Sequence, residues 1–220
     1  MKIVISILVI MSLLLVGCAV ESEPAKDMCS NLEGPQKEDC YFENMKCSKI
    51  SGDQLRELCV VELAEAKKDI TVCDLIKDDE IKGNCMKKVA VMTNNQELCN
   101  TIENQYWVNN CNFDLAINNN ENDFCSFISQ GEQQLECRKE IALATNNPLL
   151  CEYLSFIEKD KCIFTIAKKT LNVELCPSLK EPINQDSCKL NIAKLSEDKT
   201  ICKDINFDLI QEHCLAYFET

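Results

Sequence analysis

The sequence predicts an all-α fold, a right- or left-handed α-solenoid of disulfide-stapled helical hairpins with a 26-residue period. From Cys47 onward, cysteines recur at alternating steps of 12 and 14 residues, with one step of 11 between Cys151 and Cys162. Self-similarity at a period of about 20–50 residues is typical of helical arrays. The composition also favours helix, because Gly and Pro number only 5 each and aromatic residues make up 6% of the chain.

The first residues predict an exported lipoprotein. Lys2 is followed by an apolar run over residues 3–16, too short to span a bilayer and typical of a secretory signal peptide. The run ends in Leu-Val-Gly-Cys, which resembles the lipobox of exported lipoproteins. We therefore expect a signal peptide over 1–17, a lipid on Cys18, and a polar tether over 18–28. The lipid would hold the protein on the outer face of the cell membrane or of another envelope membrane.

The chain is acidic, with 36 Asp and Glu residues against 23 Lys and Arg and a net charge of −13. Removal of the signal peptide takes away one lysine and no acid, so the mature charge becomes −14. Such a charge disfavours binding to nucleic acid or to an anionic lipid surface. The lipid, and not electrostatic attraction, is the expected link to the membrane.

Each repeat is expected to begin with a short helix of about two turns. Four residues before the leading cysteine stands an N-cap residue, which is Asp69, Asn95, Asn147, Asn172 or Asp198. An apolar residue follows the leading cysteine by three positions, as Ile76 follows Cys73. Together with the apolar residue before the cysteine, it makes one apolar stripe.

A polar turn and a second helix complete each repeat, and the second cysteine lies near the middle of that helix. Four and five positions after this cysteine come a large aliphatic residue and an alanine. These pairs are Leu63-Ala64, Val89-Ala90, Leu115-Ala116, Ile141-Ala142, Ile166-Ala167 and Ile192-Ala193. The pattern predicts a filled core and a close approach between helices.

We expect residues 29–220 to form about eight such units, with atypical units at the two ends. The step from Cys40 to Cys47 is 7 residues instead of 14. We therefore expect the first unit to be truncated and to continue as one helix between these two cysteines.

Disulfides are expected within each repeat. Cys73 and Cys85 lie at equal distances from the turn at Asp79, so their side chains can meet in an antiparallel hairpin. The rival scheme, across the 14-residue steps, has poorer hairpin geometry and leaves Cys29 and Cys214 unpaired. Pairing of consecutive cysteines uses Cys29, Cys40, Cys47, Cys59, Cys73, Cys85, Cys99, Cys111, Cys125, Cys137, Cys151, Cys162, Cys176, Cys188, Cys202 and Cys214. Because the step from Cys40 to Cys47 is irregular, the sequence constrains the pairing of Cys29, Cys40 and Cys47 less than that of the other cysteines.

Catalytic, cofactor and metal sites are not expected. The chain has no C-x-x-C pair, and its single histidine, His213, adjoins a repeat cysteine. It also lacks a Gly-rich phosphate loop and a G-x-S-x-G motif. Tyr106 and Trp107 replace polar residues ahead of Cys111. They are candidates for contact with a partner, and the alternative is packing on the adjacent unit.

The lipobox, the cysteine period and the aliphatic–alanine pairs resemble those of the uncharacterised cysteine-repeat lipoproteins of archaea and bacteria. Sel1 and tetratricopeptide arrays are looser relatives with longer units. The resemblance implies a helical solenoid at the cell surface and transfers no activity. We therefore expect a non-enzymatic, lipid-anchored extracytoplasmic binding or scaffold module for a protein or peptide partner. The alternatives are a passive envelope lipoprotein that acts as a spacer or coat, and, with less support, a metal-binding or thiol-redox protein.

Overall fold

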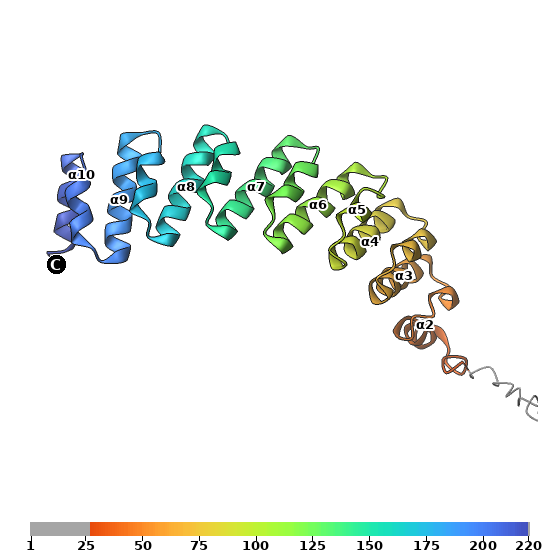
Figure 1. Ribbon diagram of the computed structural model, residues 1–220. Helices are drawn as coiled ribbons and strands as arrows, with labels where there is room; N and C mark the ends of the chain where they lie inside the picture. The colour runs from red at the N-terminus through yellow and green to blue at the C-terminus, as the bar shows by residue number, and fades with distance from the viewer. Residues whose placement is uncertain (1–26, 220) are drawn as a thin grey trace, which may run out of the picture. The chain divides into compact units, whose positions relative to one another are not determined.

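The computed structural model describes residues 27–219, and every regular element among them is a helix (Figure 1). The chain divides into two compact parts, Met1–Ser51 and Gly52–Thr220. We call the second part the hairpin array. The predicted signal peptide and lipidation residue, Cys18, lie outside the described residues, as does most of the predicted tether.

The described region of the N-terminal part holds one α-helix, α2 (Gly34–Glu43), and a short 3₁₀ helix, η1 (Cys47–Lys49). The expectation of one continuous helix between Cys40 and Cys47 is wrong. The α2 helix ends at Glu43, and two residues later Met45 has a φ of 52°, a left-handed conformation that no α-helix continues through. Lys46 then donates its backbone N–H back to the carbonyl of Tyr41, which closes the turn.

The hairpin array alternates long α-helices with short arms, and consecutive long helices lie side by side in one row (Figure 1). The long helices are α3 (Asp53–Lys67), α4 (Asp79–Met92), α6 (Gln105–Asn119), α7 (Gly131–Thr145), α8 (Phe156–Thr170), α9 (Pro182–Ser196) and α10 (Asp208–Tyr217). The short arms are η2 (Ile70–Leu75), α5 (Gln96–Cys99), η3 (Asn122–Phe127), η4 (Pro148–Tyr153), η5 (Val173–Ser178) and η6 (Lys199–Asp204). An arm and the long helix that follows it form one hairpin. The predicted helical solenoid of disulfide-stapled hairpins is confirmed.

The short arms differ from the expected two-turn α-helices. Five of the six arms in the array are 3₁₀ helices of 6 residues, and the sixth, α5, is a 4-residue α-helix. A 3₁₀ helix has three residues per turn, so residues three apart lie directly above one another. The residue that ends η2, Ile76, donates its N–H to the carbonyl of Cys73 at 3.1 Å, and both side chains are buried. The disulfide and the arm's main apolar residue thus share one core.

Each joint between hairpins is closed by a backbone hydrogen bond from the residue that opens the next arm, and at five of the six joints this residue is a predicted N-cap. The preceding long helix ends on a residue with φ between 51° and 56°, namely Lys68, Asn94, Asn120, Asn146, Leu171 or Glu197. The next residue donates its N–H to the carbonyl of the alanine five positions back, at 2.9–3.1 Å. This 6→1 bond is the mark of a Schellman C-cap.

The same residue also opens the next arm. The side-chain oxygen of Asp69 accepts the N–H of Thr71 at 3.0 Å, and Asn95, Asn147, Asn172 and Asp198 accept equivalent bonds at 2.9–3.1 Å. The five predicted N-caps are therefore confirmed. At these five joints one residue closes the preceding helix and caps the next arm, whereas Glu121 makes only the backbone bond.

The core consists of clusters of buried residues at the joints, and one of them runs through two successive joints, from Ala142 of α7 to Ile192 of α9. In another, Ala116 of α6 packs with Cys125, Ile128, Cys137 and Ile141 of the following hairpin. The alanines of all six predicted aliphatic–alanine pairs have no exposed surface. A larger side chain at these positions would push consecutive hairpins apart. The buried alanines therefore permit the close approach between helices that the pattern predicts.

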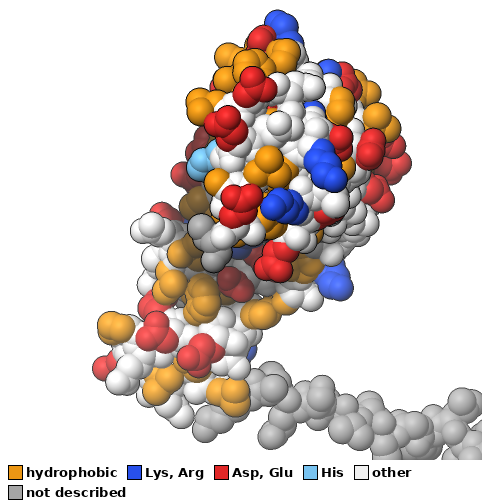
Figure 2. Space-filling model, turned by 90° about the vertical axis from the view of Figure 1, so that its left-hand side faces the viewer, with side chains coloured by type: hydrophobic (Ala, Val, Ile, Leu, Met, Phe, Trp, Pro, Cys, Tyr) orange, Lys and Arg blue, Asp and Glu red, His pale blue; other side chains and the backbone are white. Residues whose placement is uncertain are grey.

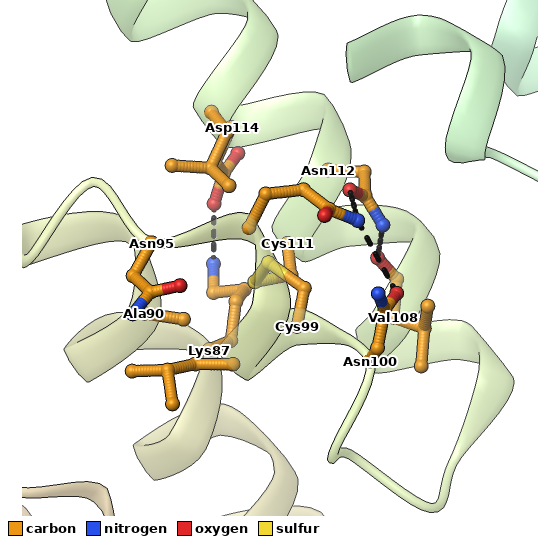
Figure 3. Close-up of a disulfide and its surroundings, with 12 residues drawn as sticks. Lys87, Ala90, Asn95, Cys99, Asn100, Val108, Cys111, Asn112 and Asp114 are labelled. Atoms are coloured by element: carbon orange, nitrogen blue, oxygen red, sulfur yellow. Dashed lines mark hydrogen bonds and ion pairs between the residues drawn. A yellow bond between two sulfur atoms is a disulfide. The ribbon is translucent and has the colours of Figure 1, made fainter.

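Seven disulfides join the two halves of their repeats, with Cα atoms 5.6–5.9 Å apart, as the hairpin argument predicts. They are Cys29–Cys40, Cys73–Cys85, Cys99–Cys111, Cys125–Cys137, Cys151–Cys162, Cys176–Cys188 and Cys202–Cys214. Cys47 and Cys59 are also disulfide-bonded. Figure 3 shows the bond from Cys99 to Cys111 between its arm and α6, next to the ion pair of Lys87 with Asp114. Of these sixteen cysteines only Cys40 is not buried.

Candidate functional site

The cysteines of the described chain serve the fold. All sixteen between residues 29 and 214 are disulfide-bonded, so none of them offers a thiolate to a metal or to a substrate. Within residues 27–219 no group of three or more His, Cys, Asp or Glu side chains is arranged to hold a metal ion. Sites of interaction must therefore come from side chains that differ between hairpins.

Such differences concentrate at the grooves between neighbouring long helices. Each groove is bordered by four equivalent positions, counted from the second cysteine of the hairpin. On the first helix they are the residue one before and the residue two after that cysteine. On the next helix they are the residues four before and one before its own cysteine. We call this space the joint groove. What fills it changes from one joint to the next.

Between α4 and α6 the joint groove is filled by Trp107, whose ring packs against Gly83 of α4. A Cβ atom at Gly83 would lie 2.2 Å from Cδ1 of the indole, so only glycine leaves room for the ring. The indole N–H donates to Oε2 of Glu80 at 3.1 Å, and the ammonium of Lys87 lies 5.9 Å from the ring centroid. Trp107 thus packs on the adjacent hairpin.

Its neighbour Tyr106 keeps 62% of its surface exposed and meets the indole edge-on, with ring centroids 5.0 Å apart. Contact of Tyr106 and Trp107 with a partner stays a prediction.

Polar contacts occupy the next two joint grooves. Between α6 and α7, Nε2 of Gln133 donates to Oδ1 of Asn110 at 3.0 Å. Between α7 and α8, Lys139 lies 4.0 Å from Glu158, which also pairs with Lys161 at 2.8 Å.

Aliphatic side chains occupy the groove between α9 and α10, where Leu190 and Ile210 pack against the cluster around Cys202 and Cys214. Each of these grooves is therefore bridged by its own side chains.

The joint groove between α8 and α9 is open. Its four positions hold Lys161, Phe164, Asn184 and Ser187, and the two small residues on α9 leave a pocket of about 470 Å³. Further lining comes from Phe156 and Ile157, which are 45% and 61% exposed. The pocket is therefore largely apolar and reaches the surface, unlike the bridged joints α4/α6, α6/α7, α7/α8 and α9/α10.

Two acids stand at the edge of this pocket, Asp160 and Glu181. Both oxygens of Asp160 lie 3.3 Å from the backbone N of Lys180. The Lys180 ammonium, in turn, lies 3.9 Å from the ring centroid of Phe156. The cation among the lining residues, Lys161, is paired with Glu158. Asp160, Glu181 and Glu158 thus outnumber Lys161 and Lys180 by one charge, in keeping with the negative charge of the whole chain.

A smaller pocket of about 270 Å³ lies between α3 and α4, lined by Leu58, Val61, Ile81 and Asn84 and bordered by Trp107. It occupies the same four positions as the α8/α9 pocket, which supports the equivalence of the joints. Figure 2 looks onto the face around α10, where acidic, basic and hydrophobic side chains are interspersed. On the face in view, neither acidic nor basic side chains form a patch of their own.

The structure also shows a set of functional side chains that the sequence patterns missed. Two residues before the second cysteine, Glu57, Asn109, Asp160 and Asp186 each accept a backbone N–H from the chain about 20 positions further on. This bond ties the loop of the next hairpin to the long helix. The position holds Gly83 and Leu135 in the two remaining hairpins of this stretch. A polar residue recurring two positions before the cysteine was the available signal.

Asp186 is the most buried member of this set, with no exposed surface. Its Oδ2 accepts the N–H groups of Asn206 and Phe207 at 2.9 Å each, and its Oδ1 accepts from Lys189 at 3.0 Å. Burial raises the pKa of Asp186, but these donors outweigh it and hold the pKa below its ordinary value of 3.8. The carboxylate is thus charged and fully bonded.

No helix of the described residues is long and apolar enough to cross a membrane. Comparisons with protein-family models, with curated proteins and with solved structures gave no match. The functional argument therefore depends on the joint grooves themselves.

The substitution Gly83→Ala tests the tight packing of Trp107. A methyl group there would displace the indole from Glu80 and from the groove. The helix gains about 1 kcal/mol from losing glycine, but overpacking costs about 1–3 kcal/mol, so we expect a net loss of stability. Trp107 is the sole tryptophan, so its fluorescence maximum should move to longer wavelength. Gly131→Ala, where a Cβ meets nothing within 4 Å, is the control, and an unchanged spectrum in Gly83→Ala would contradict the packing.

The substitution Asp186→Asn tests the buried carboxylate. At neutral pH we expect a loss of about 2–3 kcal/mol, because Lys189 and two N–H groups lose a charged acceptor. Since the folded-state pKa is lowered, the contribution of Asp186 is present above the unfolded value of about 3.9 and disappears as the pH falls through the folded value. Urea unfolding should therefore show the two proteins converging below about pH 4. The exposed Asp123→Asn should show no such convergence, and a constant difference for Asp186→Asn would refute the assignment.

Proposed function

We propose that this protein is a non-enzymatic, lipid-anchored extracytoplasmic binding module, and that the α8/α9 joint groove receives a side chain of a protein or peptide partner. The observation that carries this proposal is the 470 Å³ apolar pocket, bordered by Phe156, Ile157 and Phe164. Pockets that bind ligands commonly measure about 300–1,000 Å³ and combine apolar walls with a few polar groups.

The neighbouring joints support a binding role for this groove. In those joints, Trp107, Gln133, Lys139 and Ile210 each bridge the space between two helices. At α8/α9, Asn184 and Ser187 stand at the corresponding positions and are too short to do so. Apolar surface that an array covers at one joint and exposes at another is typical of an interaction site.

A rigid scaffold also suits binding. The groove is formed by two hairpins that are each closed by a disulfide, Cys151–Cys162 and Cys176–Cys188. Walls that are already ordered lose little conformational entropy when a partner binds, so more of the contact energy appears as affinity. Solenoids commonly use their repeated surface in this way.

The extracytoplasmic location is supported by the buried disulfides and by the Leu-Val-Gly-Cys sequence that ends at Cys18. Disulfides form and persist in oxidising compartments and are rare in the cytosol.

Mass spectrometry of the protein from its native membrane tests the anchor. We expect an N-terminal peptide that begins at Cys18 and carries a diacylglyceryl group, and we expect Cys18→Ser to release the protein from membranes. An unmodified Cys18 within a longer N-terminal peptide would contradict the lipid anchor.

A variant that closes the groove tests binding. Asn184 is the counterpart of Trp107, and Asp160 is the counterpart of Gly83. The double substitution Asp160→Gly/Asn184→Trp should therefore place an indole in the α8/α9 groove. Peptides selected from a random 12-residue display library against the unmodified protein should bind the variant about tenfold less tightly or worse.

The control is Leu195→Trp, which adds an indole to an exposed position of α9 away from the groove. Circular dichroism and thermal melting establish that both variants remain folded. Selection that yields no peptides, or peptides that bind the closed-groove variant as well as the control, would rule out the groove as the binding site.

A further inference from the structure

We infer that the side chain received by the α8/α9 joint groove is a tryptophan, carried on a positively charged peptide segment. This inference rests on the proposed function and specifies its partner. It starts from the α4/α6 joint, in which the indole of Trp107 is seated between two long helices.

The α4/α6 joint shows what such a groove accommodates. The Trp107 ring lies between the helices, its N–H reaches the Glu80 carboxylate at 3.1 Å, and its five-membered ring lies against Gly83. The indole thus brings apolar surface to the groove and one donor to an acid. The α8/α9 joint offers the same four side-chain positions and has no tryptophan among them.

The α8/α9 groove differs from the α4/α6 groove at two positions. Asp160 stands where Gly83 makes room for Trp107, and Ile157 stands where Glu80 accepts the indole N–H. A partner's indole would therefore enter this groove from the surface, over Ile157 and Phe164, and would not repeat the seat of Trp107. The apolar wall is thus larger than at the α4/α6 joint, and two aromatic rings, Phe156 and Phe164, are available for edge or offset contacts. A leucine or valine side chain would leave much of a 470 Å³ pocket empty, and unfilled apolar space forfeits contact energy.

The polar groups of the groove are acceptors for the indole N–H. Asp160 accepts one backbone N–H from Lys180 and keeps further lone pairs, since a carboxylate has about four acceptor sites. Glu181 borders the same pocket. Tryptophan combines a large apolar ring with one fixed N–H donor. Its ring can therefore pack against the apolar wall of the pocket while its N–H donates to an acid at the edge.

The charge of the site selects the rest of the segment. Around the pocket, Asp160, Glu181 and Glu158 outnumber Lys161 and Lys180 by one charge. The chain as a whole has a net charge of −13. Lysine or arginine residues beside the tryptophan would be drawn to this surface and would speed the encounter, whereas acidic neighbours would be repelled.

Three fluorescein-labelled nine-residue peptides test the inference on the full mature chain in detergent. The first has a central tryptophan between lysines, the second has leucine in place of tryptophan, and the third has glutamates in place of lysines. Fluorescence anisotropy should give the tightest binding for the first. Replacement by leucine should weaken binding about tenfold, and the glutamate peptide should be weaker still, with the gap narrowing as salt is added.

The closed-groove variant Asp160→Gly/Asn184→Trp should lose binding of the tryptophan–lysine peptide, and Leu195→Trp should keep it. Equal binding of the tryptophan and leucine peptides, lost in the closed-groove variant, would overturn the inference and leave the proposed function standing. No groove-dependent binding of any of the three would also overturn it, and the display-library selection, which presupposes no residue type, then decides on the proposed function separately. Dimers in analytical ultracentrifugation that vanish in the closed-groove variant would assign the groove to a second copy of this chain and overturn the inference.

Discussion

The disulfide inside each hairpin is the constraint on which the rest of the array depends. The short arms have 4 to 6 residues, far below the length of about 12–15 residues at which an isolated helix becomes even marginally stable in water. Each bond closes a loop of 11 or 12 residues, and in the chain-entropy model such a loop is worth about 3 kcal/mol. The covalent link therefore supplies order that the arm cannot obtain from its own hydrogen bonds.

The joints convert these separate hairpins into one array. A left-handed residue follows each long helix from α3 to α9, and the next residue donates its N–H to the alanine carbonyl five positions back. At five of these six joints the same residue also caps the arm ahead of it. Because the same four positions border the groove at each joint, the open α8/α9 groove can be compared with the groove that Trp107 fills.

Different residues of the array stabilise the fold and, in our proposal, bind a partner. Cysteines, alanines and capping residues repeat from hairpin to hairpin and hold the fold, whereas the four positions around each joint groove vary freely. The carboxylates two residues before the second cysteine belong to both groups. Asp186 is buried and structural, while Asp160 bonds the same kind of loop N–H at the edge of the open pocket. The position two residues before the second cysteine thus serves the bonding between hairpins and, in our proposal, the binding of a partner.

The sequence by itself determined the helical class, the disulfide scheme within repeats, five N-caps and the aliphatic–alanine core, because each of these depends on spacing along the chain. Only the tertiary structure decided that five of the six arms are 3₁₀ helices, since the choice between two kinds of short helix depends on packing around the buried cysteine. It also decided that Trp107 fills a groove while Asn184, its counterpart, leaves one open. That difference arises between residues of neighbouring hairpins, such as Gly83 and Trp107, which are 24 positions apart. The size of the space between two helices depends on both of their surfaces at once, so no local pattern contains it.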